Sequence, residues 1–149
     1  MFSQEETVKI VLAADHGGYE LKEAIRKDLV LGGYQIVDVG CFSNDSVDYP
    51  DFVEKAVERI VAGECQMGVL VCGTGIGVSM AANRHRNIRA ANCSNIYTAK
   101  MSREHNDANV LCLGARVLEP SDAIAMVRVW LTTEFTGGRH TTRIAKFSD

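Results

Sequence analysis

The stretch VLVCGTGIG, residues 69–77, decides the fold. An apolar run with β-branched residues ends in Cys72, glycine then occupies every second position, and a helical pattern follows from Val78 to Asn83. This order predicts a strand, an anion-binding loop and a helix, because glycine permits tight turns and the first helical turn leaves N–H groups unpaired. A thiol at the lip of that loop, near the positive end of a helix, should lose its proton more easily than a free cysteine.

Five strand-like segments alternate with five helix-like segments along the chain. The expected strands cover residues 9–14, 34–39, 67–72, 88–93 and 110–113. The expected helices cover residues 19–31, 50–62, 78–84, 97–103 and 121–133. This alternation predicts one α/β domain over residues 1–149, with a Rossmann-like open five-stranded parallel sheet, helices on both faces and the strand order 2-1-3-4-5.

Polar and reactive residues follow the carboxyl ends of these strands. Asp15 and His16 follow the first strand, Cys72 ends the third, Ser94 follows the fourth and Arg116 follows the fifth. In an open parallel sheet, ligands bind beyond the carboxyl ends of the strands, where the winding reverses. The first and third strands are neighbours in the expected order, so Asp15, His16 and Cys72 should share one crevice.

Composition argues against several classes of partner. The 149 residues carry 16 basic and 19 acidic side chains, so no basic field favours nucleic acid or an acidic membrane surface. No apolar run approaches the roughly 20 residues of a membrane span, and the first residues lack a signal peptide's features. Five cysteines, never spaced as Cys-x-x-Cys, indicate reduced thiols in the cytoplasm. The four histidines are scattered, and no metal site is expected.

Two common nucleotide-binding motifs do not fit the glycine loop. The Walker motif requires a lysine after its last glycine, and none follows here. The dinucleotide fingerprint requires Gly-x-Gly-x-x-Gly, whereas the third glycine here comes one residue early. No nucleotide cofactor is therefore expected. The alternative interpretation of Gly73, Gly75 and Gly77 is a tight strand-to-helix turn with no ligand.

Two histidine-containing motifs each have a structural and a functional interpretation. Asp15-His16 fits a helix N-cap followed by an exposed histidine, but beside a reactive thiol the pair would handle protons. His105-Asn106-Asp107 lies between the fourth helix and the fifth strand. It fits a solvated cap and turn, or a loop that reaches over the crevice.

Three arginines suggest a phosphate site. Arg116, Arg139 and Arg143 stand out because an arginine fork matches a phosphate and the rest of the chain is not basic. Arg139 and Arg143 are four residues apart, so a terminal helix would present them on one face. Each of the three also fits an ordinary surface position.

Together these residues suggest two kinds of chemistry. The parts are a thiol, a set of backbone donors, the hydroxyl of Thr74, an acid/base pair and a phosphate clamp. A base beside an oxyanion site suits proton abstraction next to a carbonyl, with the enediolate held by N–H groups. The alternative is acyl or thiol chemistry with Cys72 as the nucleophile.

Six motifs in order resemble a known family. They are ADHGG (14–18), DYP (48–50), VCGTGIG (71–77), SREHND (102–107), GARV (114–117) and GGRH (137–140) followed by Arg143. This set resembles the type B ribose-5-phosphate isomerases, which are related to the isomerases of allose 6-phosphate and galactose 6-phosphate. The resemblance runs nearly from end to end of the chain.

The resemblance implies a specific reaction and a role for each matching residue. Ribose 5-phosphate and ribulose 5-phosphate would interconvert through a cis-enediolate, without metal or cofactor. Cys72 would be the base, Thr74 would move a proton between the substrate oxygens, His105 would open the ring and Asp15 would hold a sugar hydroxyl. Another branch of the family uses a glutamate where this chain has Val78, so the cysteine branch fits. The substrate-binding residues implied are His16, Tyr49, Gly73, Gly75, Ile76, Gly77, Asn106, Arg116, Arg139 and Arg143.

The resemblance also implies an assembly. In the family the site lies between two subunits, so we expect a homodimer or a pair of dimers, with residues 134–149 reaching the partner's site. Galactose 6-phosphate isomerases use two different subunits, whereas this chain carries the whole set of residues and should be self-sufficient. Two alternatives stay open: an isomerase of a six-carbon sugar phosphate, and a module that binds a sugar phosphate without turning it over.

Overall fold

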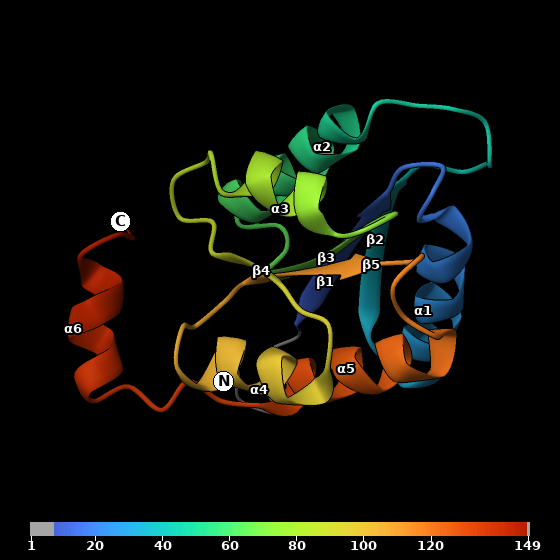
Figure 1. Ribbon diagram of the computed structural model, residues 1–149. Helices are drawn as coiled ribbons and strands as arrows, with labels where there is room; N and C mark the ends of the chain where they lie inside the picture. The colour runs from blue at the N-terminus through green and yellow to red at the C-terminus, as the bar shows by residue number, and fades with distance from the viewer. Residues whose placement is uncertain (1–7, 149) are drawn as a thin grey trace.

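Five parallel strands form the centre of the fold in the computed structural model, which describes residues 8–148 (Figure 1). They are β1 (Lys9–Ala14), β2 (Gln35–Gly40), β3 (Met67–Cys72), β4 (Ala90–Asn92) and β5 (Val110–Gly114). The helices are α1 (Tyr19–Leu31), α2 (Tyr49–Val61), α3 (Ile76–Ala82), α4 (Ile96–Glu104), α5 (Pro120–Thr132) and α6 (Arg139–Ala145). The open α/β sheet confirms the predicted fold class. The expected domain of residues 1–149 extends beyond the described residues at both ends.

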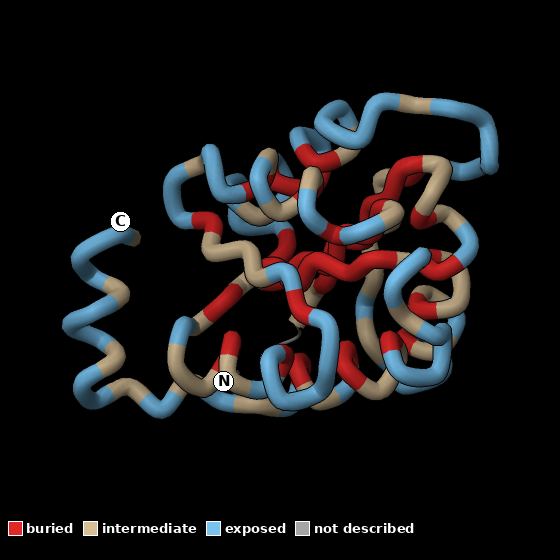
Figure 2. Tube along the Cα trace, in the orientation of Figure 1, coloured by how far each residue is buried: buried red, intermediate tan, exposed pale blue. Residues whose placement is uncertain are grey.

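Helices cover both faces of the sheet, as predicted. The residues of α1, α4 and α5 pack into one buried cluster, and those of α2 and α3 pack into a second cluster on the other face. All six residues of β3 are buried, because this strand lies in the middle of the sheet between the two layers. Figure 2 shows the buried positions concentrated along the strands and on the helix faces that point to them.

The strand order differs from the prediction in one respect. It is β2-β1-β3-β5-β4, so the last two strands exchange places. The physical reason is their burial: β4 has three residues, none of them buried, whereas all five residues of β5 are buried. A short and partly polar strand suits the edge of a sheet, and a continuous apolar strand suits its interior.

The corrected order changes which residues are neighbours of Cys72. Cys72 pairs with Gly114 at the end of β5, so Arg116 follows the adjacent strand. Ser94 follows the edge strand and lies one strand further away. The chain leaves β3 toward one face, and it leaves both β1 and β5 toward the other face. The carboxyl end of β3 is therefore a point where the winding reverses on both sides.

A sixth helix, α6, follows the five predicted ones, at the place where the sequence allowed a terminal helix. It has no buried residue and lies beyond the end of the sheet opposite to the one at which the β5 arrow points (Figure 1). Among the described residues, no helix combines the length and the apolar character that crossing a bilayer requires.

Candidate active site

Cys72 lies at the carboxyl end of β3, where the glycine loop begins. Its Sγ accepts a hydrogen bond from the backbone N–H of Gly75 at 3.1 Å, and the side chain is 5% exposed. Gly75 has φ +81° and precedes α3 directly, and a Cβ at this position would collide with the amide of Asn92. Only glycine fits this combination of positive φ and close approach. The loop thus points an N–H group at the sulfur, the kind of partner that a thiolate requires.

The glycine loop also carries donors that the chain itself does not use. Within residues 8–148, the backbone N–H groups of Gly73 and Thr74 donate to no acceptor. Thr74 is exposed, and its Oγ1 accepts a hydrogen bond from the N–H of Ile76 at 3.2 Å. The loop is a tight turn, as the alternative interpretation holds, but two free donors beside a thiol exceed what a turn requires. They can stabilise a negatively charged oxygen.

Arg116 and Asp15 flank this loop. The backbone N–H of Arg116 donates to the carbonyl of Gly73 at 2.9 Å, and a Cβ on Gly73 would come within 2.7 Å of the guanidinium. A Cβ on Gly17 would lie 3.3 Å from Asp15 Oδ1 and 3.4 Å from Arg116 Nη2. The buried Asp15 accepts a hydrogen bond from the backbone N–H of Gly18 at 3.1 Å, just before α1. The interpretation of Asp15 as a helix-capping residue is therefore correct in part. Its carboxylate nevertheless lies beside the loop, as predicted.

His16 and Tyr49 complete this side of the sheet. His16 Nδ1 lies 3.2 Å from the backbone N–H of Val47, which can only donate, so Nδ1 is the acceptor and the ring proton is on Nε2. Tyr49 lies against Gly77, where a Cβ would come within 2.6 Å of its ring. We call Asp15, His16, Tyr49, residues 72–77 and Arg116 the carboxyl-edge group.

The remaining predicted residues form a second group at the opposite edge. Because α4 begins after β4 and ends before the parallel strand β5, His105 lies at the amino ends of the strands. Backbone hydrogen bonds confirm this position, since Asn109 connects to Arg89 before β4 and to Gly68 at the start of β3. The chain before α6 is tied to the same place by a bond from Thr136 N to the carbonyl of Glu104. We call His105, Asn106, Arg139, His140 and Arg143 the amino-edge group.

The two groups do not meet within one chain. A strand of six residues such as β3 is roughly 20 Å long at about 3.3 Å per residue, and the groups lie beyond its two ends. The interpretation that the loop at His105 reaches over the crevice of Cys72 is therefore wrong for a single chain. Periodicity located the elements correctly, but the direction of α4 carries His105 away from that crevice.

His140, which the sequence placed in a motif without assigning it a role, stacks on His105. The two ring centroids are 4.3 Å apart and the ring planes differ by 13°. Desolvation, and then the neighbouring His105, Arg139 and Arg143, lower the pKa of His140. The signal that could have found it is the motif GGRH, which puts His140 directly after Arg139, one of the predicted phosphate ligands.

We expect nuclear magnetic resonance titration to give His140 a pKa below 6.5. Because the pKa is lowered in the folded chain, the stacked arrangement is most favoured above about pH 6.5 and becomes less favoured as the pH falls toward the lowered value. Replacing His105 with asparagine should raise the pKa of His140. A pKa of His140 at or above 6.5 would contradict this description of the stack.

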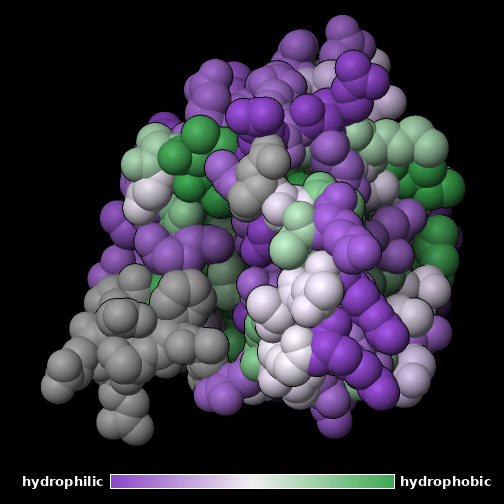
Figure 3. All heavy atoms as spheres, turned by 90° about the vertical axis from the view of Figure 1, so that its left-hand side faces the viewer, coloured by the Kyte–Doolittle hydropathy of each residue, from purple (hydrophilic) through white to green (hydrophobic). Residues whose placement is uncertain are grey.

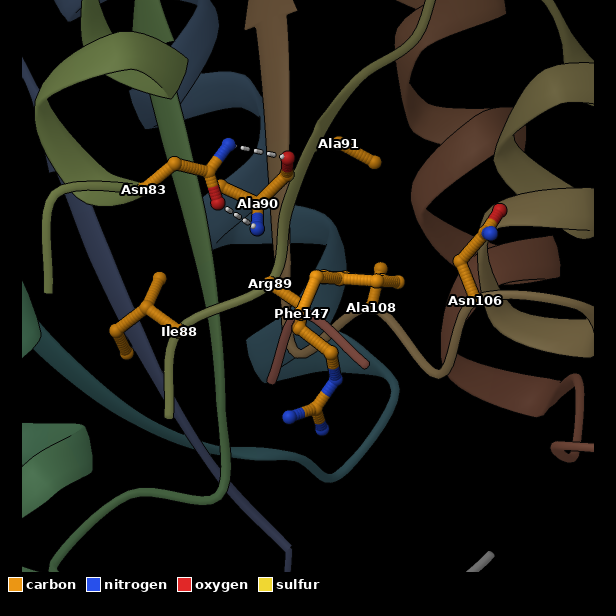
Figure 4. Close-up of a pocket in the computed structure, with 8 residues that line it drawn as sticks. All are labelled: Asn83, Ile88, Arg89, Ala90, Ala91, Asn106, Ala108 and Phe147. Carbon is orange, nitrogen blue, oxygen red and sulfur yellow. Dashed lines mark hydrogen bonds between the residues drawn. The ribbon is translucent and has the colours of Figure 1, made fainter. Parts of the chain in front are cut away.

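A cavity of about 410 Å³ lies beside the amino-edge group. It is lined by Asn83, Ile88, Arg89, Ala90, Ala91, Asn106, Ala108 and Phe147, as Figure 4 shows. Asn83 is held in its wall by two hydrogen bonds to the backbone of Ala90, of 2.8 and 2.9 Å. Figure 3 shows the molecule from the side of α6, where hydrophilic surface surrounds smaller apolar patches. The lining of this cavity includes no member of the carboxyl-edge group.

The other four cysteines are buried free thiols. Burial raises the pKa of Cys41, Cys65 and Cys93, and it raises that of the fully enclosed Cys112 well above its usual value. Such thiols stay protonated and behave as small hydrophobic side chains, as the sequence indicated for three of them. No group of three or more His, Cys, Asp or Glu within residues 8–148 is placed to hold a metal ion.

Fold and site together define an open α/β protein with a thiol and a glycine loop with free backbone donors at the carboxyl edge of its sheet. A family model described as Ribose/Galactose Isomerase matches residues 10–147. The chain therefore belongs to the ribose/galactose isomerase family.

Named relatives cover almost the whole chain. Ribose-5-phosphate isomerase B of Escherichia coli is 42% identical over 136 residues, which are 91% of each chain. The structure of ribose-5-phosphate isomerase B from Clostridium thermocellum is 52% identical, with a TM-score of 0.92 over 93% of this chain and 94% of that one. The structure of the Mycoplasma genitalium enzyme with bound ribulose-5-phosphate is 38% identical, with a TM-score of 0.90 over 95% of each chain.

Proposed function

We propose that this protein is an aldose–ketose isomerase that interconverts ribose 5-phosphate and ribulose 5-phosphate. The observation that carries the proposal is the position of Cys72 beside two unused backbone donors. The proposal is supported by the similarity to ribose-5-phosphate isomerase B over nearly the whole chain. It is further supported by the related structure from Mycoplasma genitalium, which holds ribulose-5-phosphate.

The proposed reaction uses Cys72 as a base. The thiolate removes the proton from C2 of the open-chain aldose, and the electrons move onto the aldehyde oxygen to give the cis-enediolate. The free N–H groups of Gly73 and Thr74 stabilise the negative oxygen. The Thr74 hydroxyl passes a proton between the two oxygens, and Cys72 returns its proton to C1 to give the ketose. A proton transfer of this kind needs no metal or cofactor.

We propose that a second copy of the chain completes the site. His105 and the arginines of α6 lie beyond the other end of the sheet from Cys72, and one small sugar phosphate cannot touch both groups of one chain. In a two-fold dimer, the amino-edge group of each chain would face the carboxyl-edge group of its partner. His105 and Asn106 would then bind the sugar for ring opening, and α6, which buries no residue of its own, would belong to the tail that reaches the partner.

Arg139 and Arg143, together with Arg116 and His16, would bind the phosphate. We expect Arg139→Ala and Arg143→Ala each to raise KM about 10- to 100-fold, because a charge-assisted hydrogen bond to phosphate contributes about 1.5–3 kcal/mol. The effect on kcat should be smaller, and steady-state kinetics separates the two constants. Arg59→Ala is the matched control, since the ion pair of this arginine is with Glu64, which belongs to neither group. An unchanged KM in either α6 variant would remove that arginine from the phosphate site.

Parallel assays on three sugar phosphates test the proposed function. The protein should turn over ribose 5-phosphate with a higher kcat/KM than allose 6-phosphate or galactose 6-phosphate. Preference for either six-carbon substrate would assign it to the other activity of the family. Binding of all three without turnover would indicate a sugar-phosphate binding module. The free thiols suit a reducing compartment, and we place the proposed enzyme in the cytoplasm.

A further inference from the structure

The loop of residues 41–48, between β2 and α2, contacts the carboxyl-edge group near its far end. Its Val47 N–H donates to His16 Nδ1 and so fixes which nitrogen of that ring carries the proton. The next element begins with Tyr49, which lies against the glycine loop at Gly77. The position of this loop therefore decides where two predicted substrate-binding side chains stand. It is the long teal segment that leads to α2 in Figure 1.

The loop has little packing of its own to hold it. Residues 42–46 and Asp48 are all exposed. Its internal side-chain bonds are a contact from Cys41 Sγ to the carbonyl of Ser43 and one from Asp45 N to Ser43 Oγ. A segment with so few buried contacts takes its position from its ends.

The start of the loop is fixed by Asp38. The Oδ1 of this residue accepts from the N–H of Gly40 at 2.9 Å, and the N–H of Cys41 donates to the carbonyl of Ala14 at 2.7 Å. The pairing of β1 with β2 shifts its register here, because Leu12 faces Asp38 while Ala13 faces Gly40. Such a bulge redirects the chain as it leaves the sheet.

Lys22 lies beneath this exit and is fully buried. Its Nζ is 2.6 Å from Asp38 Oδ2, 3.1 Å from Glu23 Oε1 and 5.2 Å from the ring centroid of Phe42 in the loop. A buried charge pair adds little net stability over apolar residues of the same size, so stability does not explain its presence. The pair instead helps to fix the path of the chain as it leaves β2. Lys22 contacts Asp38, which holds Gly40, and it also contacts Phe42, the first exposed side chain of the loop.

We propose that Lys22 is a positioning residue that, through Asp38 and Phe42, holds the loop of residues 41–48 against His16 and Tyr49 for substrate binding. The proposal rests on the proposed function, since it assigns Lys22 to the same sugar-phosphate site. The ammonium group touches no reacting atom. It acts through the exit of β2 and through the ring of Phe42.

Kinetics of Lys22→Met test the proposal. This change keeps the length of the side chain and removes the charge, and KM for ribose 5-phosphate should rise about tenfold while kcat falls less than threefold. Phe42→Leu should raise KM in the same direction, and because Phe42 is 65% exposed this variant should fold even if Lys22→Met does not. Arg128→Met is the matched control. It breaks another ion pair of α1, with Asp28, and should leave KM unchanged.

Hydrogen exchange gives a readout that does not depend on activity. In Lys22→Met, the hydrogen-bonded amides of Cys41 and Val47 at the two ends of the loop should exchange at least about tenfold faster than in the wild type, while Arg128→Met should match the wild type. Faster exchange of the loop together with a raised KM supports the proposal. Wild-type exchange in the loop, or an unchanged KM in both Lys22→Met and Phe42→Leu, would overturn it. Absence of turnover in the wild-type protein would instead refute the proposed function, and the exchange experiment would still decide whether Lys22 holds the loop.

Discussion

Replacing Cys72 with alanine is expected to lower kcat for ribose 5-phosphate about 10³-fold while KM changes less than about threefold. General-base catalysis contributes typically about 10²–10⁴-fold, and a role confined to the transition state affects kcat rather than substrate binding. In free energy this is about 4 kcal/mol. The substitution removes only the sulfur that accepts the N–H of Gly75, so the loop and its two free donors should keep their place.

A second thiol provides the control for this experiment. Cys65 is equally buried but lies just before β3, at the amino end of the sheet. Cys65→Ala should cost some stability, as the removal of a buried side chain does, and leave kcat within about twofold of the wild type. If Cys72→Ala kept the kcat of the wild type, Cys72 would not be the base.

Mixing two inactive variants is expected to restore activity. Chains with Cys72→Ala and chains with His105→Asn each lack one half of the proposed site. In a mixed two-fold dimer, one of the two sites combines the intact Cys72 of one chain with the intact His105 of the other. Random mixing in equal amounts makes half of the dimers mixed, so the activity should reach about a quarter of that of the wild type. Refolding the variants together, followed by a rate measurement, provides the test.

The control for the mixing experiment uses a chain that carries both substitutions. Equal amounts of this double variant and the wild type should show about a quarter of the activity of the same total amount of wild type, because every mixed dimer is inactive. About half would remain if each chain worked alone. That result, or the absence of recovery with the two single variants, would refute a site shared between chains.

The sequence predicted the elements better than their arrangement. Continuous apolar runs such as Lys9–Ala14 mark buried strands, and they coincide with the strands observed. The order of the last two strands is decided by which of them can be covered on both faces. The alternation of strands and helices carries no such information, although the weak apolar character of residues 88–93 is a signal that this strand belongs at the edge.

The arrangement of side chains at the carboxyl edge was also predictable, because the strand ends bring distant residues together. Asp15, Cys72 and Arg116 lie at the ends of three neighbouring strands and close to one another. His105 was misplaced although the predicted order of the elements already puts a residue that precedes a parallel strand at the amino edge. Its proposed use depends on another chain, which one sequence does not show. Nothing in the sequence indicates that Lys22 is buried or that it helps to position the loop. A lysine on a helix is expected to be solvated, whereas Lys22 is buried where Asp38 and Phe42 lie over α1.

Turnover of ribose 5-phosphate in heavy water tests the central claim most directly. If Cys72 removes the proton from C2 and returns one to C1, deuterium from the solvent should appear at C1 of ribulose 5-phosphate in a measurable fraction of turnovers, and Cys72→Ala should abolish this exchange. Exchange that continues at the wild-type rate in Cys72→Ala would contradict the assignment of Cys72 as the base.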